Sequence, residues 1–488
     1  MKRIIPIVLT ATLNLLLLNS VFAKVKLPAI IASNMVLQRN TDVTLWGWAD
    51  ANEKITIKTS WLSDELKFSA DKSGNWNIKI QTTNSKAPQT IQLTSKTSDI
   101  ILDNILFGEV WLCSGQSNME QSVSGYGNDQ PTFETLQTIA RANNKNIRLF
   151  TVKRNGSKTP LNDIEKYNPW AEANTENVPG FSALAYFFGK QLQEILDVPV
   201  GIIHASWGGS SIQPWISNAT MRTFQTVNLD DVDINKRTNH IPTALFNAMI
   251  NPLIPFNIKG ALWYQGESNR REPQKYKELF PAMVKDWRTR WGLGDFPFYY
   301  VQIAPYYYKD YDAFQSIMNS AFIREVQLQC AKEIPNSGIA ILTDIGAEKC
   351  IHPPKKKEAA ERLVFHALNK TYGFKGLDCE SPVYKSMEIK EGGIELSFEH
   401  AERGLYAYGK LTGFEIAGAD KVFYPADAQI VFKHKTVFVK SDKVPNPVAV
   451  RYAWSNWVVG SLFDTNMLPA SSFRTDNWDN ATRFNEKE

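Results

Sequence analysis

The hydrophobic pattern divides the chain into three parts. From residue 24 to about residue 104, short runs such as 43–48 and 54–59 alternate apolar and polar residues, and turn residues such as those of 71–75 separate the runs. Alternation with a period of two is typical of half-buried strands. Because no helical pattern of useful length interrupts this stretch, we expect an N-terminal β-sandwich-like domain over residues 24–104.

From about residue 105, continuous apolar runs alternate with helical patterns. The expected strands are 109–113, 147–152, 200–206, 260–264, 298–302 and 338–343, and the expected helices are 182–196, 276–290, 313–331 and 355–371. This alternation is typical of a mostly parallel sheet covered by helices, so we expect an α/β domain over residues 105–380. Period-two runs return at 394–398 and 435–439 and predict a C-terminal β region over residues 381–488, whose packing the pattern leaves open.

Residues 1–23 have the pattern of a signal peptide. Lys2 and Arg3 precede an apolar stretch that closes on small residues at Ala23, which suits cleavage there. An uncleaved anchor is the alternative, but the apolar stretch is short and is broken by Thr10 and Asn14. We therefore expect an exported, periplasmic or secreted product with no membrane partner after cleavage.

Length and charge narrow the class of protein. A chain of 488 residues exceeds what one hydrophobic core usually supports, in agreement with several domains. The formal charge of +4 is small, and the basic run 355–357 lies beside acidic residues at the start of a helical pattern, so we expect no nucleic-acid partner. Four cysteines in an oxidising compartment permit disulfides with three possible connectivities, between which the sequence does not choose.

The first candidate for chemistry is Ser117. It follows an apolar strand and a glycine-containing turn, and ligands in α/β domains bind just beyond the carboxyl ends of strands. Met119 stands where the G-x-S-x-G motif requires its second glycine, so the nucleophile elbow of α/β-hydrolases is not supported. The alternative is a serine that caps a helix.

A nucleophilic serine needs a base to take its proton. Of the six histidines, His352 has the most suitable position, because it lies in a loop between the expected strand 338–343 and the expected helix 355–371. A structural role for this histidine is the alternative. Two further strand ends, 206–211 and 263–269, carry glycine, serine and amide residues that suit an oxyanion hole, or that serve turns and helix caps instead.

Together these residues resemble the sialate O-acetylesterases of the SGNH (GDSL-like) hydrolase superfamily. The matching blocks are 35–39, 46–48, 115–119, 206–209, 263–269, 351–353, 468–470 and 473–476, which span nearly the whole mature chain. The resemblance implies an SGNH-type, flavodoxin-like three-layer α/β/α hydrolase domain flanked by β-sandwich-like regions.

The resemblance also assigns roles to residues. It implies that Ser117 attacks an acetyl carbonyl and that His352 is the general base, with no metal or cofactor. Oxyanion donors would be the Ser117 N–H, a glycine of the 208–209 pair, for which we choose Gly209, and the Gln265 side chain. Asn118, Glu267 and Trp207 are expected to contact the substrate.

The third member of the triad departs from the pattern of the superfamily. Many relatives carry Asp three residues before the histidine, where this chain has Lys349. Asp344 is the first choice to orient His352, with Glu267, Glu348 or a backbone carbonyl as alternatives.

Three functions remain at this point. The resemblance favours an esterase that removes acetyl groups from O-acetylated sialic acid. The alternatives are an acetyl esterase for xylan or another plant polysaccharide, and a noncatalytic carbohydrate-binding protein. The presence of both Ser117 and His352 argues against the last, because binding alone requires neither a nucleophile nor a base. An acetylated carbohydrate is the expected partner.

Overall fold

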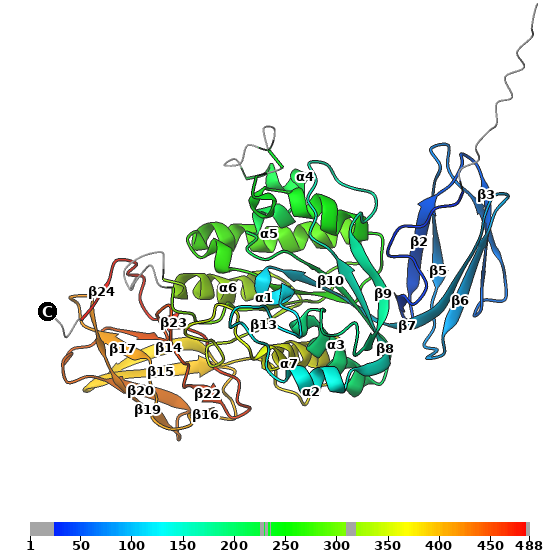
Figure 1. The fold of residues 1–488 in the computed structure, drawn as a ribbon. Coiled ribbons are helices and arrows are strands. Elements are labelled where there is room, and N and C mark those ends of the chain that lie inside the picture. The colour runs from blue at the N-terminus through cyan, green and yellow to red at the C-terminus, as the bar shows by residue number, and fades with distance from the viewer. Residues whose placement is uncertain (1–23, 225–228, 230–232, 235, 309–318, 485–488) are drawn as a thin grey trace, which may run out of the picture.

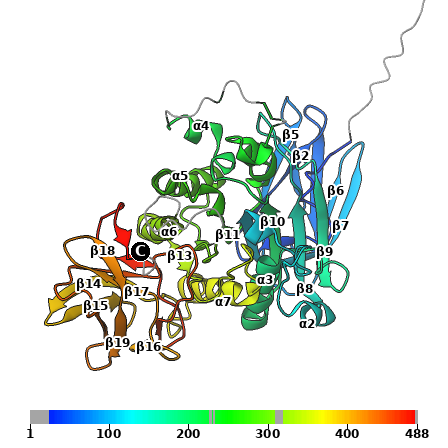
Figure 2. The same cartoon turned by 60° about the vertical axis from the view of Figure 1, so that its left-hand side comes forward.

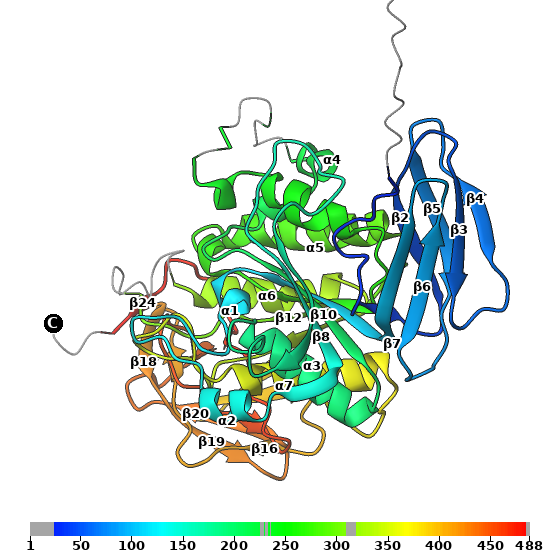
Figure 3. The same ribbon diagram turned by 45° about the vertical axis from the view of Figure 1, so that its right-hand side comes forward.

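A computed structural model describes residues 24–224, 229, 233–234, 236–308 and 319–484. The expected signal peptide and the first residues of the expected helix 313–331 lie outside these ranges. An α/β region occupies the middle of the molecule, and the two β regions lie at opposite ends of it (Figure 1, Figure 3). The C-terminal β region therefore does not pack on the N-terminal one.

The N-terminal β region has two antiparallel layers that share one core. β2 (Asp42–Trp48) pairs with β5 (Asn75–Gln81), and β3 (Lys54–Thr59) pairs with β4 (Leu66–Ser69) and β6 (Gln89–Thr94). The alternating apolar residues of both layers point inward, where Phe68 and Trp76 have ring centroids 5.5 Å apart. The predicted strands of this region are confirmed.

One long strand, β7 (Asp99–Gly115), joins this region to the central sheet. Its first half pairs antiparallel with β6, and the short β1 (Val36–Gln38) runs parallel to its middle. From Ile105 onward every residue of β7 is buried. The change from alternating to continuous burial marks its passage into a sheet that is covered on both faces.

The central sheet has the strand order β13-β12-β11-β7-β10-β8-β9. Its strands are β8 (Asn143–Val152), β9 (Tyr167–Asn174), β10 (Val200–Ser206), β11 (Gly260–Tyr264), β12 (Phe298–Val301) and β13 (Ser337–Ala340). All six predicted strands are present, and the adjacent pairs among these six run parallel. β9, the antiparallel edge strand, was not predicted, because it is mostly polar, contains Pro169 and buries few side chains, as an edge position allows.

Helices cover both faces of this sheet (Figure 2). α5 (Pro273–Trp291) and α6 (Ala321–Glu333) bury their apolar residues in one core, and α3 (Ala183–Leu196) and α7 (Lys356–His366) bury theirs in another. The α/β region thus has the expected three layers. The short α-helices are α1 (Ser117–Glu120), α2 (Thr135–Ala140) and α4 (Asn218–Met221). A π-helical turn η6 (Ala367–Thr371) follows α7, and further short 3₁₀ or π-helical turns are η1 (Gln213–Trp215), η2 (Thr238–His240), η3 (Phe246–Ile250), η4 (Asn251–Leu253) and η5 (Glu267–Asn269).

The C-terminal β region has a core of its own. β14 (Val383–Lys390), β15 (Gly393–Glu399), β20 (Thr436–Lys440) and β19 (Asp427–Val431) form one sheet. A second sheet contains β23 (Phe473–Arg474), β21 (Ala449–Tyr452), β17 (Phe414–Ala417), β18 (Val422–Pro425) and β24 (Thr482–Arg483), and β16 (Leu405–Tyr406) pairs with β22 (Phe463–Asp464).

The four cysteines, Cys113, Cys330, Cys350 and Cys379, are free thiols in this structure, so none of the three possible disulfide connectivities is present. Within the described ranges, no helix combines the length and the apolar character that a membrane span requires.

Candidate active site

The turn that carries Ser117 is fixed by glycine and by backbone hydrogen bonds. Gly115 has φ +142°, and a Cβ atom at this position would lie 2.2 Å from the carbonyl oxygen of Tyr264, so no other residue fits. The Gln116 N–H donates to the same carbonyl over 2.9 Å. Ser117 follows as the first residue of α1, half-buried at the carboxyl end of β7.

Two contacts bring the loop of His352 to this turn. The Tyr126 hydroxyl donates to the Ser117 carbonyl over 2.9 Å, and the Tyr126 ring meets the imidazole edge-to-face with centroids 5.0 Å apart. The Asn118 amide donates to the carbonyl of Ile351, the residue before His352, over 3.1 Å. The structure therefore brings the two predicted catalytic segments together from opposite ends of the α/β region.

Within the described part of the chain, the side chain that is hydrogen-bonded to the His352 ring is a glutamine and not a carboxylate. His352 Nδ1 is hydrogen-bonded to Oε1 of Gln130, and an amide oxygen only accepts, so Nδ1 carries the proton and Nε2 keeps its lone pair. Burial and the nearby Lys356 ammonium lower the pKa of His352 to about 4, whereas Glu120 acts in the opposite direction. The imidazole is therefore neutral, as a general base must be.

The expected orienting role of Asp344 does not agree with this geometry. Both carboxylate oxygens of Asp344 accept from Arg362, at 2.8 and 2.6 Å. Of the two alternative carboxylates, Glu267 is hydrogen-bonded to Asn118, and Glu348 is exposed. Among the described residues, none of these three carboxylates is hydrogen-bonded to His352.

Sequence reasoning missed Gln130, and its surroundings explain why. It lies in a polar connection between α1 and α2 that has no hydrophobic period, and its amide is not a titratable group that a search for a triad acid would select. Two hydrogen bonds within this connection fix its conformation. The Gln130 carbonyl accepts from the Tyr126 N–H over 2.9 Å and from the Gln121 side chain over 3.1 Å.

The expected oxyanion donors differ in their availability. Ser117 N–H lies in the first turn of α1, where backbone N–H groups have no acceptor within the helix. Gly209 is exposed with φ +70°, in the turn that follows β10. Gln265, by contrast, is fully buried, and its two N–H groups already donate to the Ser210 carbonyl over 3.1 Å and to Asn269 over 2.7 Å. Neither is left for an oxyanion.

Glu120 fixes the glycine turn beside the nucleophile, a role the sequence did not reveal. Its carboxylate accepts from the Gly208 N–H over 2.8 Å and from Arg154 through two bonds of 2.6 Å. A Cβ atom on Gly208 would lie 3.3 Å from the Cβ of Ser117, which shows how closely this turn approaches the nucleophile.

Two of the three expected substrate-binding residues are buried. Asn118 and Glu267 are 1% and 7% exposed, and they bond each other at 2.5 Å. Oδ1 of Asn118 also accepts from the Lys356 ammonium. Burial raises the pKa of Glu267 and lowers that of Lys356 to about 7. Only the half-buried Trp207 keeps surface that a substrate can reach.

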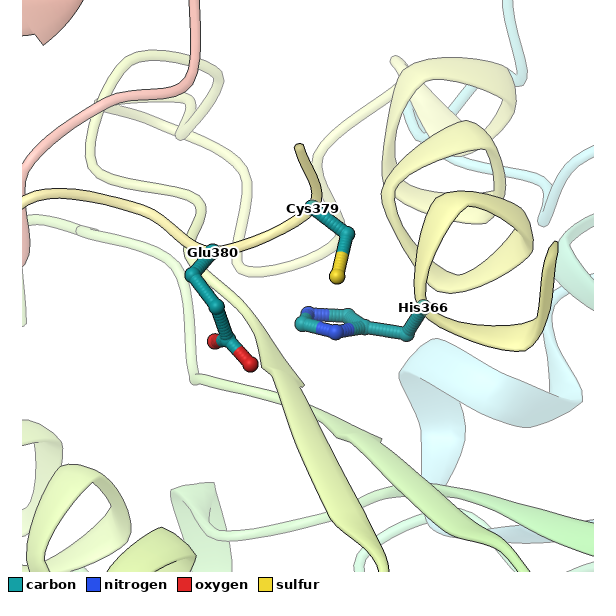
Figure 4. A group of neighbouring side chains, drawn as sticks. All are labelled: His366, Cys379 and Glu380. Carbon is teal, nitrogen blue, oxygen red and sulfur yellow. The ribbon is translucent and has the colours of Figure 1, made fainter. Parts of the chain in front are cut away.

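One group of side chains among the described residues has the chemistry of metal ligands. Ligand atoms of His366, Cys379 and Glu380 lie within 4.8 Å of one another (Figure 4). The Lys370 ammonium is already paired with Glu380 at 2.6 Å, and burial raises the pKa of the Cys379 thiol to about 12. His366 ends α7 whereas Lys356 begins it, so roughly 15 Å of helix separate this group from the network around Asn118.

This chain is similar to known carbohydrate esterases. The family model described as a carbohydrate esterase, sialic acid-specific acetylesterase, matches residues 108–348. A sialate O-acetylesterase of Mus musculus is 27% identical over 514 residues, 91% of this chain and 93% of the relative, and that of Homo sapiens is 28% identical over 469 residues, 88% and 87%. A crystal structure of a carbohydrate acetylesterase from Xanthomonas citri is 34% identical with a TM-score of 0.85, and the match covers 93% of this chain and 100% of that one.

Proposed function

This chain belongs to the sialic acid-specific acetylesterase family of carbohydrate esterases and is a carboxylic ester hydrolase, and we propose that it removes acetyl groups through an acetyl-enzyme formed on Ser117. The observation that carries this proposal is the meeting of the Ser117 turn and the His352 loop through Tyr126 and Asn118. The proposal includes the SGNH-type fold, which the helices on both faces of a parallel sheet support.

In each step of the proposed reaction, one proton moves to or from Nε2 of His352. Ser117 Oγ attacks the acetyl carbonyl carbon while its proton passes to Nε2 of His352, the imidazole nitrogen left free by the bond between Nδ1 and Gln130. The bond from the acetyl carbon to the sugar oxygen then breaks, and the imidazolium returns the proton to that oxygen. A water then attacks the acetyl carbon while its proton passes to Nε2 of His352. The bond from that carbon to Ser117 Oγ breaks, and the imidazolium returns the proton to Oγ, which releases acetate and restores the serine.

Two backbone groups are proposed to stabilise the oxyanion. The Ser117 N–H is unused within α1, and the Gly209 N–H belongs to the turn that Glu120 holds beside Ser117. Hydrogen-bond donors that already point toward the oxyanion before the reaction each raise kcat by a factor of about 10² to 10³. Gln265 contributes by holding Ser210 and Asn269 behind this turn.

The proposed substrate is O-acetylated sialic acid. The names of the relatives from Mus musculus and Homo sapiens support it. The carbohydrate acetylesterase from Xanthomonas citri, which matches over its whole length, supports a second candidate, another acetylated carbohydrate such as xylan. Parallel measurement of acetate released from 9-O-acetyl sialic acid and from acetylated xylan decides between them, since the preferred substrate is the one with the higher kcat/KM.

The nucleophile is tested by Ser117→Ala. We expect the variant to fold as the parent does and to release acetate from a chromogenic acetyl ester more slowly by a factor of about 10⁴ or more, because loss of a triad nucleophile leaves only binding and the oxyanion donors. Ser114→Ala, at a buried serine of β7 that bonds the Ala205 carbonyl, is the matched control and should keep most of the activity. Near-normal activity of Ser117→Ala would exclude this serine as the nucleophile.

A further inference from the structure

We propose that Lys356 and Asn118 are positioning residues that hold the His352 loop against the turn that carries Ser117. The inference rests on the proposed function, because it assigns a role to residues around the base of that reaction. Neither residue is expected to touch the substrate, since both are 1% exposed.

The three hydrogen bonds of the Asn118 side chain reach three different segments. Its NH₂ group donates to Oε1 of Glu267, which follows β11 in the chain, and to the Ile351 carbonyl in the loop that carries the base His352. Its Oδ1 accepts from Lys356 in α7. Ser117 is the neighbour of Asn118 in the chain. The amide therefore connects the nucleophile directly to the residue that precedes the base.

Lys356 fixes the direction in which this amide points. An ammonium group only donates, so its bond to Oδ1 forces the NH₂ group of Asn118 toward its two acceptors. If the amide turned over, it would place NH₂ against the ammonium and Oδ1 against a carbonyl and a carboxylate. Lys356 thus selects the one amide orientation that binds the base loop.

Burial of a lysine side chain destabilises a fold, and the Lys356 side chain is almost completely buried. The ammonium lies 5.6 Å from the ring of Tyr264 and near the Glu267 carboxylate, whose second oxygen is buried without a hydrogen-bond partner in the described structure. Burial of a charge destabilises a fold unless the charge is paired. Retention of a cation here agrees with a role at the adjacent site.

The same ammonium acts on the base through space. The groups that face His352 are Lys356 of α7, Glu120 of α1 with its partner Arg154, the Tyr126 ring, the neutral Gln130 amide and the Cys350 thiol, whose Sγ donates to the His352 carbonyl. Lys356 disfavours the imidazolium, and Glu120 favours it. Because the pKa of Lys356 is about 7, this lysine is charged throughout the acidic range in which His352 titrates.

Removal of the charge tests both parts of the role. For Lys356→Met we expect kcat for a chromogenic acetyl ester to fall about tenfold or more while KM changes less than about threefold, because the base is misplaced and the substrate site is not. We expect the acidic limb of the kcat/KM profile to move up by about half a pH unit, because loss of a nearby positive charge raises the pKa of His352. Lys357→Met, at the next residue in an exposed ion pair with Glu134, should change neither quantity.

A second variant guards against loss of the fold. Lys356→Met leaves Glu267 buried without its cation, so the double variant Lys356→Met with Glu267→Gln removes both charges and retains both shapes. Thermal unfolding establishes that each variant is folded. Lower kcat together with the raised acidic limb in the double variant supports the inference; kcat within about twofold of the parent and an unmoved limb in a folded variant overturn it. Full activity of Ser117→Ala would instead refute the proposed function, so the two failures are distinct.

Discussion

His352 is held by a neutral amide where a carboxylate would also stabilise the protonated ring. Gln130 fixes the tautomer and the direction of the imidazole, and it adds no negative charge. Burial and Lys356 then keep the pKa of the ring at about 4. Such an imidazole stays unprotonated down to acidic pH, but it accepts a proton less strongly than an imidazole that is paired with a carboxylate.

The role of Gln130 predicts a pH effect. Gln130→Glu should raise the pKa of His352, since an anion beside Nδ1 favours the imidazolium. Only the neutral ring is a base, so activity falls as the pH drops through this pKa, and the acidic limb should move to higher pH. Gln130→Ala should lower kcat by about tenfold to a hundredfold through loss of orientation.

The measurement is the pH dependence of kcat/KM for a small acetyl ester, from pH 3.5 to pH 8. Gln137→Glu, at an exposed position of α2, adds the same charge away from the ring and should leave the limb in place. A limb that stays put, or that moves to lower pH, in Gln130→Glu would show that Gln130 is not the partner of the base.

At the scale of elements, the active site is built from the ends of neighbouring parallel strands. β10, β7 and β11 are adjacent in the sheet, and their carboxyl ends carry the 206–209 turn, Ser117 and the 265–269 turn. Gly115 allows β7 to approach Tyr264 closely enough for the turns to share hydrogen bonds. The precision of the site therefore depends on one backbone contact between two strands.

This contact predicts the effect of a single methyl group. Gly115→Ala should destabilise the protein by about 2 kcal/mol or more and reduce activity, because Cβ would meet the Tyr264 carbonyl at 2.2 Å and φ is +142°. Gly180→Ala is the matched control, since no atom lies within 4 Å of its Cβ position. Chemical denaturation measures both, and equal stability of the two variants would contradict the argument.

At the scale of the whole molecule, the C-terminal β region is anchored beside the base loop. Arg324 of α6 is fully buried and donates to the carbonyls of Ala453 and Ser455 and to the Ser472 hydroxyl. The Gly460 N–H donates over 2.8 Å to the carbonyl of Thr343, where the loop of His352 begins. The region thus supports the loop that carries the base.

Arg324→Met should weaken this anchor. The substitution leaves the carbonyls of Ala453 and Ser455 and the hydroxyls of Ser320 and Ser472 without this donor, and each buried polar group that stays unsatisfied costs about 1 to 3 kcal/mol. We expect a lower melting temperature and a lower kcat. Arg403→Met, at an exposed position, should leave both unchanged, and a parental melting temperature for Arg324→Met would show that the anchor contributes little.

Local pattern predicted most of the elements. β10 and β11 begin and end at the predicted residues, because continuous apolar runs between turns are typical of strands buried on both faces. The edge strand β9 and the helix α1, which has only four residues, carry too little hydrophobic signal for such a prediction. Ser117 and His352 stood out because each follows a predicted strand of the α/β region, and ligands in such regions bind just beyond the carboxyl ends of strands.

The sequence by itself therefore determined the order of β and α/β regions, the strands of the central sheet, the family and the two residues proposed for catalysis. The tertiary structure decided which side chains serve them. Gln130 bonds His352 and Lys356 bonds Asn118, and the members of these pairs are 222 and 238 residues apart in the chain, while Asp344 and Gln265 are bound by other partners. Hydrophobic period is a local property that a sequence displays, whereas a hydrogen-bond partner depends on how segments far apart in the chain are packed.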